Sequence, residues 1–371
     1  MTMWLVYVAL FAIAFTVSTA LTYLVMKVSS RIGFVDRPAA RKVHTGPVPL
    51  GGGLAIIATM FAVIGAVALA ALTVNKRPDY LNLSERMRAY AGGVSLVLHH
   101  LVIGGIGALI LMVMGLVDDT RGLRPLTKLV IQVLVAVLLV AGGTTVTLYL
   151  PWKAAGWIAT VVWMVFAMNS FNLLDNMDGL SSGVAFIIAA VFLAVAIETG
   201  QLFIAALLVV FAGSVLGFMV LNFPPAKIFM GDTGSYFLGY VLGLTAVIFS
   251  FVPRGVASQA TLFPIALPFI LFAIPFYDTL SVIWIRVREG RHPFMADKRH
   301  FSHRLTDLGM TKREAVFTIY AATLTTAVPA LYLYHLNTFS LLGAVVQALL
   351  VLLLVAILEH AGARKKQDNG S

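Results

Sequence analysis

Residues 100–117 read HLVIGGIGALILMVMGLV, and Asp118 and Asp119 follow this run directly. A helix that crosses a bilayer needs roughly 20 mostly apolar residues, and this run is close to that length. Carboxylates at the edge of hydrocarbon are costly to keep there, so acids at the end of such a run are candidates for function. The same arrangement recurs along the chain, which places the chemistry of a membrane protein where its helices end.

The composition supports a membrane-embedded chain. Of the 371 residues, 60% are hydrophobic and only 11% are charged, whereas soluble domains carry about 25% charged residues. The pattern predicts an all-α polytopic membrane protein with about eleven transmembrane helices. The first run is expected to be retained as a span because no basic segment precedes it. The expected spans are 3–26, 51–73, 100–117, 126–141, 154–171, 180–199, 201–221, 234–251, 262–285, 314–334 and 338–358.

The basic residues predict the orientation. If the N-terminus lies outside, 20 of the 26 Lys and Arg residues fall in inside breaks, as the positive-inside rule requires. The C-terminus and the acidic breaks would then be cytoplasmic, and inside loops account for the net charge of +10. We expect one transmembrane domain over 1–371, an external loop at 74–99 in which an amphipathic surface helix can form, a cytoplasmic basic loop at 286–313 and a disordered tail at 360–371. The chain has no Cys, which excludes disulfides, thiolate catalysis and zinc–thiolate sites.

The break after residue 117 joins Asp118 and Asp119 to Lys128, near the start of the next run. Adjacent carboxylates can hold Mg²⁺, or one can act as a base while the other tunes it. A polar turn with Asp near Arg is the alternative.

The next inside break holds Asn172, Asp175 and Asp178 at steps of three. On a helix these residues share a face, which suits oxygen ligation or recognition of sugar and base edges. The alternative is helix capping, for which one such residue is enough.

Two breaks end in glycine-rich helix starts. Asp232 lies in Gly-Asp-Thr-Gly-Ser (231–235), where free N–H groups and the positive end of a helix dipole favour a metal–phosphate cluster; a simple N-cap is the alternative. Residues 51–53 are three glycines whose N–H groups could receive an anion. A rigid basic connection is the alternative there.

The longest inside break carries His300, His303 and Arg304. Such residues suit phosphate binding, although a solvated basic loop is the plainer interpretation.

Taken together, these stretches resemble the polyprenyl-phosphate N-acetylhexosamine-1-phosphate transferases, glycosyltransferase family 4. The resemblance covers about 31–316 and is closest to the branch that uses undecaprenyl phosphate and N-acetylglucosamine-1-phosphate. The matching stretches are Gly33-Phe-Val-Asp-Arg-Pro with Arg41-Lys-Val-His, Gly115-Leu-Val-Asp-Asp, Asn172-Leu-Leu-Asp-Asn-Met-Asp-Gly-Leu, Pro225-Ala-Lys-Ile-Phe-Met-Gly-Asp-Thr-Gly-Ser and Ala296-Asp-Lys-Arg-His-Phe-Ser-His-Arg-Leu.

The resemblance implies that a polyprenyl phosphate attacks the β-phosphorus of a UDP-N-acetylhexosamine, giving a lipid-diphosphate sugar and UMP. The reaction would begin a cell-envelope polysaccharide at the cytoplasmic face of the plasma (inner) membrane. Mg²⁺ is the implied cofactor, with Mn²⁺ as the other option, and no nucleic acid is expected as a partner. The oligomeric state stays open, with a homodimer as one option.

The family's site residues carry over to positions in this chain. Asp232, helped by Asn172, is implied as the metal ligand, and Asp118 as the base with Asp119 beside it. Whether an Asp acts as a covalent nucleophile instead is left open. The other implied residues are Lys128 and His303 for catalysis, and Asp175, Asp178, Asn222, Phe229, His300 and Arg304 for the nucleotide sugar, with Phe229 stacking on uracil.

The chain also departs from the family pattern. Ser302 stands where the family has His, Asn176 where it has Gly, and Thr45 and Leu50 where it has basic residues. These departures leave the implied metal residues unchanged.

Other functions were weighed against the transferase. The branch that transfers phospho-N-acetylmuramoyl-pentapeptide is opposed by Leu174 and Ser302, whereas UDP-N-acetylgalactosamine stays open as a substrate. An ion-coupled transporter would need acids near the bilayer midplane, and only Asp278 lies within an expected span. An inactive lipid-binding homologue is disfavoured because Asp118, Asp119 and Asp232 are all present.

Overall fold

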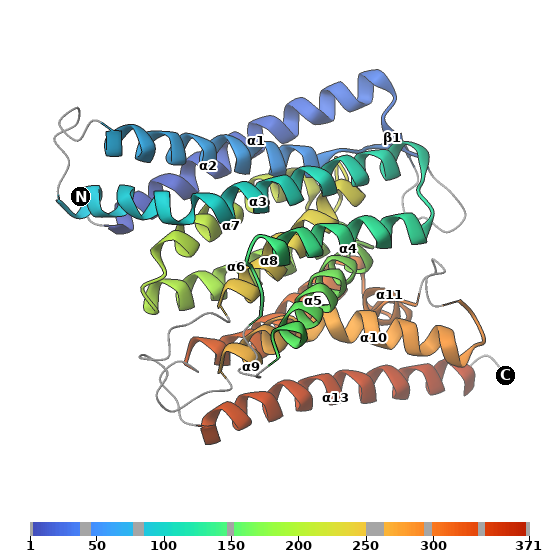
Figure 1. Ribbon diagram of the computed structural model, residues 1–371. Coiled ribbons are helices and arrows are strands. Elements are labelled where there is room, and N and C mark those ends of the chain that lie inside the picture. The colour runs from blue at the N-terminus through green and yellow to red at the C-terminus, as the bar shows by residue number, and fades with distance from the viewer. Residues whose placement is uncertain are drawn as a thin grey trace.

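The computed structural model describes residues 3–37, 46–76, 85–146, 152–249, 263–292, 299–332 and 338–368. These residues form a helical bundle (Figure 1), and the only strands among them are a two-residue antiparallel pair. The elements are α1 (Met3–Ile32), β1 (Val35–Asp36), β2 (Val48–Pro49), α2 (Gly52–Lys76), α3 (Glu85–Arg121), α4 (Pro125–Ala141), α5 (Lys153–Leu174), α6 (Leu180–Glu198), α7 (Leu202–Asn222), α8 (Asp232–Phe249), α9 (Phe263–Leu271), α10 (Ala273–Arg288), α11 (Phe301–Asp307), α12 (Lys312–Ala327), η1 (Val328–Leu331) and α13 (Thr338–Asp368).

The chain is a polytopic membrane protein, as its sequence predicts. Within the described ranges, nine helices are long and apolar enough to cross a membrane, and α4 is a shorter apolar helix. The expected span at 262–285 is two helices, because α9 ends at Leu271 and α10 begins at Ala273. Pro275 explains the interruption, since it has no N–H to donate to the carbonyl of Leu271.

Two segments are more helical than the sequence predicts. α3 begins at Glu85, so much of the expected external loop at 74–99 is helical, as the surface-helix alternative allows; residues 77–84 lie outside the described chain. α13 extends to Asp368, so the expected disordered tail at 360–371 is helical up to that residue. The reason is composition: Ala, Arg, Lys and Gln are good helix formers, and cations favour a helix C-terminus.

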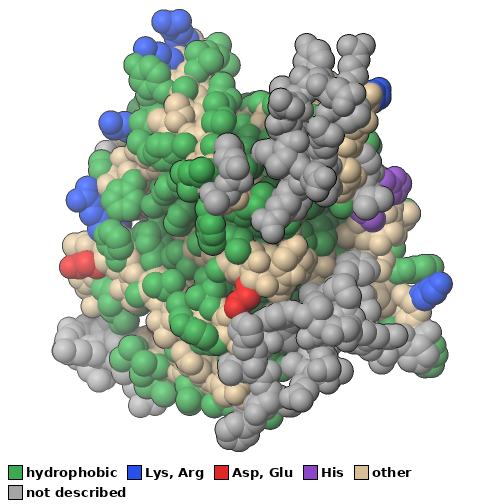
Figure 2. All heavy atoms as spheres, turned by 90° about the vertical axis from the view of Figure 1, so that its left-hand side faces the viewer, with side chains coloured by type: hydrophobic (Ala, Val, Ile, Leu, Met, Phe, Trp, Pro, Cys, Tyr) green, Lys and Arg blue, Asp and Glu red, His purple; other side chains and the backbone are tan. Residues whose placement is uncertain are grey.

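The inner helices are α6, α7 and α8, and the outer ones include α1 and α13. Of the most apolar window of α8, 83% is buried, against 17% for α13. Figure 1 shows α1 and α13 at opposite edges of the bundle, with α8 between them. Figure 2 views the end at which α1 begins, where the described side chains are mostly hydrophobic and charged ones are few. The outer helices therefore present apolar faces to lipid, while α8 lies inside the bundle and begins at Asp232.

Glycines let two helices approach the first turn of α8 at backbone distance. A Cβ on Gly53 of α2 would lie 2.3 Å from the Gly234 nitrogen, and one on Gly115 of α3 would lie 2.3 Å from the Thr233 Cα. Small residues permit such close helix contacts in membranes. The starts of α2 and α8 and the end of α3 consequently meet at one end of the bundle.

Candidate active site

Four helix ends bring a lysine, two carboxylates and an amide together. Lys128 Nζ, on α4, lies 2.7 Å from Asp118 Oδ2 and 3.2 Å from Asp232 Oδ2. On the other side, Asn172 Nδ2 at the end of α5 donates to Asp232 Oδ1 at 3.0 Å and to the Ser235 hydroxyl at 3.0 Å. We call Asp118, Lys128, Asn172 and Asp232 the acidic cluster.

The acidic cluster is partly open to solvent. The side chains of Lys128, Asp118 and Asp232 are 20%, 8% and 32% exposed, so a reactant can reach Asp232 while Asp118 is mostly covered. The single ammonium group of Lys128 pairs with two carboxylates, which leaves the acidic cluster with a net negative charge. Such a group is suited to receive a second cation.

Asp119 binds the backbone at the start of α8, unlike Asp118, which binds Lys128. Its Oδ1 accepts from the Asp232 N–H at 2.7 Å, and its Oδ2 accepts from the Thr233 N–H at 3.1 Å and the Thr233 hydroxyl at 2.7 Å. Asp119 thus caps the N-terminus of α8 from another helix, a favourable place for a carboxylate. Gly231 has a φ of 77°, and a Cβ there would lie 2.5 Å from Asp119 Oδ2.

The first two residues of α2, both glycines, do not form an open anion cradle. The N–H groups of Gly52 and Gly53 donate to the carbonyls of Phe229 and Met230 at 3.0 and 2.9 Å, and the Phe229 N–H donates to Pro49 at 2.8 Å. The N–H groups of Gly52 and Gly53 are therefore already satisfied and do not receive an anion. The contacts fix the backbone of Phe229 and Met230 just before Asp232.

The break between α5 and α6 is held by side-chain contacts to the loop before α8. Asp178 Oδ2 accepts from the Ala226 N–H at 3.0 Å. Asn222, only 5% exposed, accepts from the Gly179 N–H at 3.0 Å and donates to the Ile228 carbonyl at 2.9 Å. The carboxamide of Asn222 therefore joins the two breaks and shapes the space between them.

Asp175 lies at the C-terminal end of α5, between Asn172 and Asp178 in sequence. Burial raises the pKa of Asp175 well above its ordinary value, and the negative charges of Asp232, Asp119 and Asp178 raise it further. The carboxyl group of Asp175 therefore gives up its proton less readily than that of an exposed Asp.

The histidine–arginine segment is anchored to α10 and α13. His300 Nδ1 lies 3.0 Å from Asp278 Oδ2, and the Phe301 N–H donates to Asp278 Oδ1 at 2.6 Å. Asp278, the one acid expected within a span, thus anchors α11. Arg304 donates to Glu359 Oε1 at 2.9 Å and to the Ser281 hydroxyl at 2.8 Å. The Arg304 guanidinium is directed to these helices, and the contacts described for it do not include the acidic cluster.

Sequence reasoning missed a pair of amides next to the acidic cluster, of which one, Gln132, is buried. Asn169 Nδ2, one turn before Asn172, donates at 2.6 Å to Oε1 of Gln132, one turn after Lys128. Gln132 is fully buried, and its Nε2 has no partner among the described residues. The pair ties α4 to α5 directly below the two side chains that bind Asp232. Polar residues within two apolar runs were the available signal.

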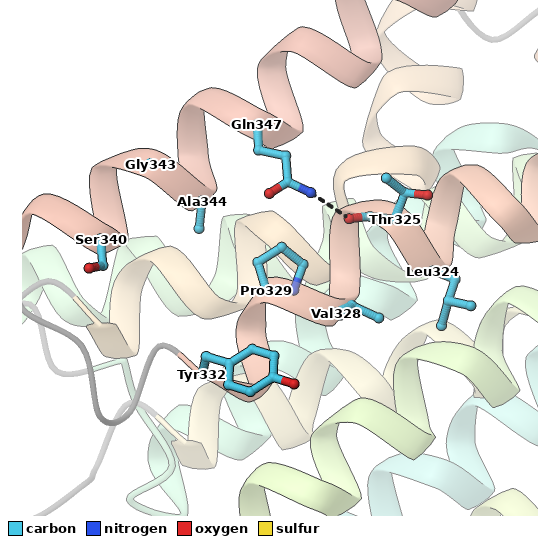
Figure 3. Close-up of a pocket in the computed structure, with 9 residues that line it drawn as sticks. All are labelled: Leu324, Thr325, Val328, Pro329, Tyr332, Ser340, Gly343, Ala344 and Gln347. Atoms are coloured by element: carbon cyan, nitrogen blue, oxygen red, sulfur yellow. Dashed lines mark hydrogen bonds between the residues drawn. The ribbon is translucent and has the colours of Figure 1, made fainter.

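A cavity of about 760 Å³ lies elsewhere, between α12, η1 and α13 (Figure 3). Figure 3 shows Gln347 pointing across it to the Thr325 carbonyl, to which it donates at 3.3 Å. At 1.5 Å per residue, Leu324 at its edge is roughly 18 Å along α12 from Lys312. Arg313, at the start of α12, donates at 2.9 Å to the carbonyl of Pro224, which lies in the loop before α8. The cavity is therefore separate from the acidic cluster.

The donor set is suitable for a hard divalent cation. Across the part of the chain that the structure describes, no three His, Asp or Glu side chains are grouped as a complete metal cage. The acidic cluster instead offers the carboxylates of Asp118 and Asp232 and the amide oxygen of Asn172. Oxygen ligands of this kind fit Mg²⁺, which usually keeps several waters and takes one or two carboxylates from the protein.

Comparison with known proteins finds a matching family and several relatives. Residues 101–250 match the family described as glycosyl transferase family 4. The chain is 33% identical to a probable undecaprenyl-phosphate N-acetylglucosaminyl 1-phosphate transferase of Bacillus subtilis, over 84% of this chain and 81% of the relative.

Two further relatives come from other bacteria. A decaprenyl-phosphate N-acetylglucosaminephosphotransferase of Mycolicibacterium smegmatis is 34% identical, over 78% of this chain and 73% of the relative. An undecaprenyl-phosphate alpha-N-acetylglucosaminyl 1-phosphate transferase of Yersinia pestis is 26% identical, over 86% and 80%. The resemblance found in the motifs is confirmed, and the chain belongs to glycosyl transferase family 4.

Proposed function

We propose that the protein transfers N-acetylglucosamine-1-phosphate from UDP-N-acetylglucosamine to a polyprenyl phosphate. The products are a lipid-diphosphate sugar and UMP. Three relatives named for this kind of transfer support the proposal. The single observation that carries it is Lys128 between Asp118 and Asp232 at the start of α8, because phosphoryl transfer needs positioned charge rather than covalent chemistry by the protein.

In the reaction, an oxygen of the lipid phosphate attacks the β-phosphorus of the UDP-sugar. The bond between that phosphorus and the bridging oxygen breaks, and UMP leaves with the electron pair. Asp118, held by Lys128 and by the Leu123 N–H at 2.6 Å, is placed to take up or orient the proton of the lipid phosphate. Lys128 supplies positive charge beside the incoming phosphates.

Asp232 and Asn172, with Asp118 nearby, would hold Mg²⁺, and Mn²⁺ is the alternative ion. The ion would supply charge neutralisation for the diphosphate and the departing UMP. Asp119 would then serve the reaction by fixing the start of α8, and with it Asp232.

For the nucleotide sugar, we propose a site between the α5–α6 break and the loop before α8. Asp175 and Asp178 would face the nucleoside, Phe229 would stack on uracil, and Asn222 would shape the pocket from within. His303 would face the phosphates or the sugar, whereas His300, which is 5% exposed and bound to Asp278, is expected to act through the position of α11. Arg304 is expected to act through the position of α11, because Glu359 and Ser281 already bind its guanidinium.

The membrane arrangement is proposed as eleven spans with the N-terminus outside. α4 and the α9–α10 pair would be added to the nine long helices. α1 begins and α13 ends at opposite ends of the bundle (Figure 1), which fits an odd number of crossings. The positive-inside rule then places the acidic cluster at the cytoplasmic face. A homodimer stays a prediction.

The test is transfer by purified protein. We would supply polyprenyl phosphate, Mg²⁺ and radiolabelled UDP-N-acetylglucosamine, with UDP-N-acetylgalactosamine and the muramoyl-pentapeptide nucleotide in parallel. We expect UMP release and labelled lipid carrying one sugar with the first nucleotide, dependence on Mg²⁺, and loss of both products in Asp232→Asn. Folded protein that turns over none of the three nucleotides would refute the proposal, and turnover of another one would correct the substrate.

A further inference from the structure

Two side chains from breaks that are far apart in the sequence contact each other. The hydroxyl of Ser302, on α11, donates to the Oδ1 of Asn176, in the α5–α6 break. Ser302 is 1% exposed, so its hydroxyl cannot exchange this partner freely for water. The contact joins segments that are 126 residues apart in the sequence.

Asn176 is itself fixed to the end of α5. Its Nδ2 donates to the Leu173 carbonyl at 2.8 Å, and its N–H donates to the Leu174 carbonyl at 2.9 Å. Asp175 precedes it directly, and Asp178 lies two residues after it. A displacement of Asn176 would therefore move both carboxylates that we assign to the nucleoside.

α11 depends on such contacts for its position. It has only seven residues, Phe301–Asp307, and helices this short are unstable alone. Asp278, 1% exposed, binds its N-terminus through His300 and the Phe301 N–H. That contact fixes α11 to α10, whereas the Ser302 contact fixes it to the α5–α6 break.

We propose that Ser302 and Asn176 are a positioning pair that sets the affinity for the nucleotide sugar. The inference rests on the proposed function and names residues of the same site that the family resemblance does not supply. The pair holds the α5–α6 break and α11 in one relative placement, so that Asp175, Asp178 and His303 approach the same substrate from two segments. Neither residue takes part in bond making or breaking.

The experiment is a double-mutant cycle with Ser302→Ala, Asn176→Ala and the combined variant. Because a neutral hydrogen bond contributes roughly 0.5–1.5 kcal/mol, each single change should raise KM for UDP-N-acetylglucosamine about two- to twelvefold. KM of the combined variant should not exceed the higher of the two single-variant values, since both changes remove the same contact. KM for the lipid phosphate should stay within about twofold, because Lys128 and Asp118 are untouched.

Two variants serve as controls. Thr306→Ala removes another α11 hydroxyl, one that donates only locally to the His303 carbonyl at 2.8 Å, and should leave KM unchanged. Ser302→Thr keeps the hydroxyl and should stay close to wild type. Additive effects of the two Ala changes, or equal rises in KM for both substrates, would overturn the inference.

An exchange variant tests the coupling independently. Ser302→His alone should weaken binding of the nucleotide sugar, because the larger ring meets the Asn176 side chain; adding Asn176→Gly should restore it. If Ser302→His is not rescued by Asn176→Gly, the inference fails. Failure of the proposed function and failure of the positioning pair give different results. Wild-type protein that performs no transfer refutes the proposed function, whereas wild-type transfer with an unchanged KM in the variants refutes only the positioning pair. Calorimetric binding of UMP measures the affinity of each variant independently of transfer.

Discussion

Asp119→Asn should act mainly by loosening the first turn of α8. The carboxylate accepts three hydrogen bonds there, at 2.7, 3.1 and 2.7 Å. Asn has only one acceptor oxygen. Its NH2 group would face a backbone N–H, which is also a donor, so at least one charge-assisted hydrogen bond is lost. With about 1.5–3 kcal/mol for that bond and about 0.3–1 kcal/mol for the charge at the helix N-terminus, we expect a cost of about 2–4 kcal/mol.

The assay pairs thermal unfolding in detergent with turnover at several Mg²⁺ concentrations. Asp119→Asn should melt well below wild type and need more Mg²⁺, because Asp232 is no longer held. Asp118→Asn is the matched control: its carboxylate binds Lys128 and the Leu123 N–H instead of the α8 terminus, so turnover should fall with a smaller change in melting. Wild-type melting of Asp119→Asn, with turnover as low as in Asp118→Asn, would refute the capping role.

Three further predictions concern packing, pH and the buried amides. Gly53→Ala should destabilise the protein by about 1–3 kcal/mol because its Cβ would lie 2.3 Å from the backbone of α8. Gly65→Ala is the control and should be neutral or stabilising, because nothing lies within 4 Å of its Cβ. The melting temperatures of the two variants test this difference. The raised pKa of Asp175 means that the folded state binds its proton more tightly than the unfolded state, so stability should fall as pH rises from about 4 through the folded pKa. Asp175→Asn in metal-free buffer should remove that part of the pH dependence and melt higher at neutral pH, and an unchanged pH profile would contradict the assignment. Gln132→Leu should lower kcat/KM by about tenfold or less, and Asn169→Leu should add little to it in a double-mutant cycle.

The sequence established the membrane class and most of the helix positions, because long apolar runs are a local property. It was wrong at two places where one local signal outweighed another. The run at 262–285 is broken because Pro275 removes one helical hydrogen bond, a signal present in the sequence but outweighed by hydrophobicity. The polarity of the tail after residue 359 predicts disorder, whereas its residues are good helix formers and continue α13 to Asp368.

The acidic cluster shows the same division. Local pattern was enough to single out Asp118, Asp232, Asn172 and Lys128 as chemically unusual residues, because charged and amide groups beside hydrocarbon are costly unless they serve a purpose. Their pairing was not a local property, since Lys128 and Asp232 are 104 residues apart.

By itself, the sequence determined that this chain spans a membrane and that its acids lie at helix ends. Only the tertiary structure decided which acid does what: Asp118 binds a lysine, while its neighbour Asp119 caps α8. It likewise decided that the N–H groups of residues 52 and 53 are occupied and that Arg304 binds Glu359. The physical reason is that hydrophobicity and helix propensity are carried by each segment, whereas a hydrogen-bond partner is chosen by the packing of helices that are remote in the chain.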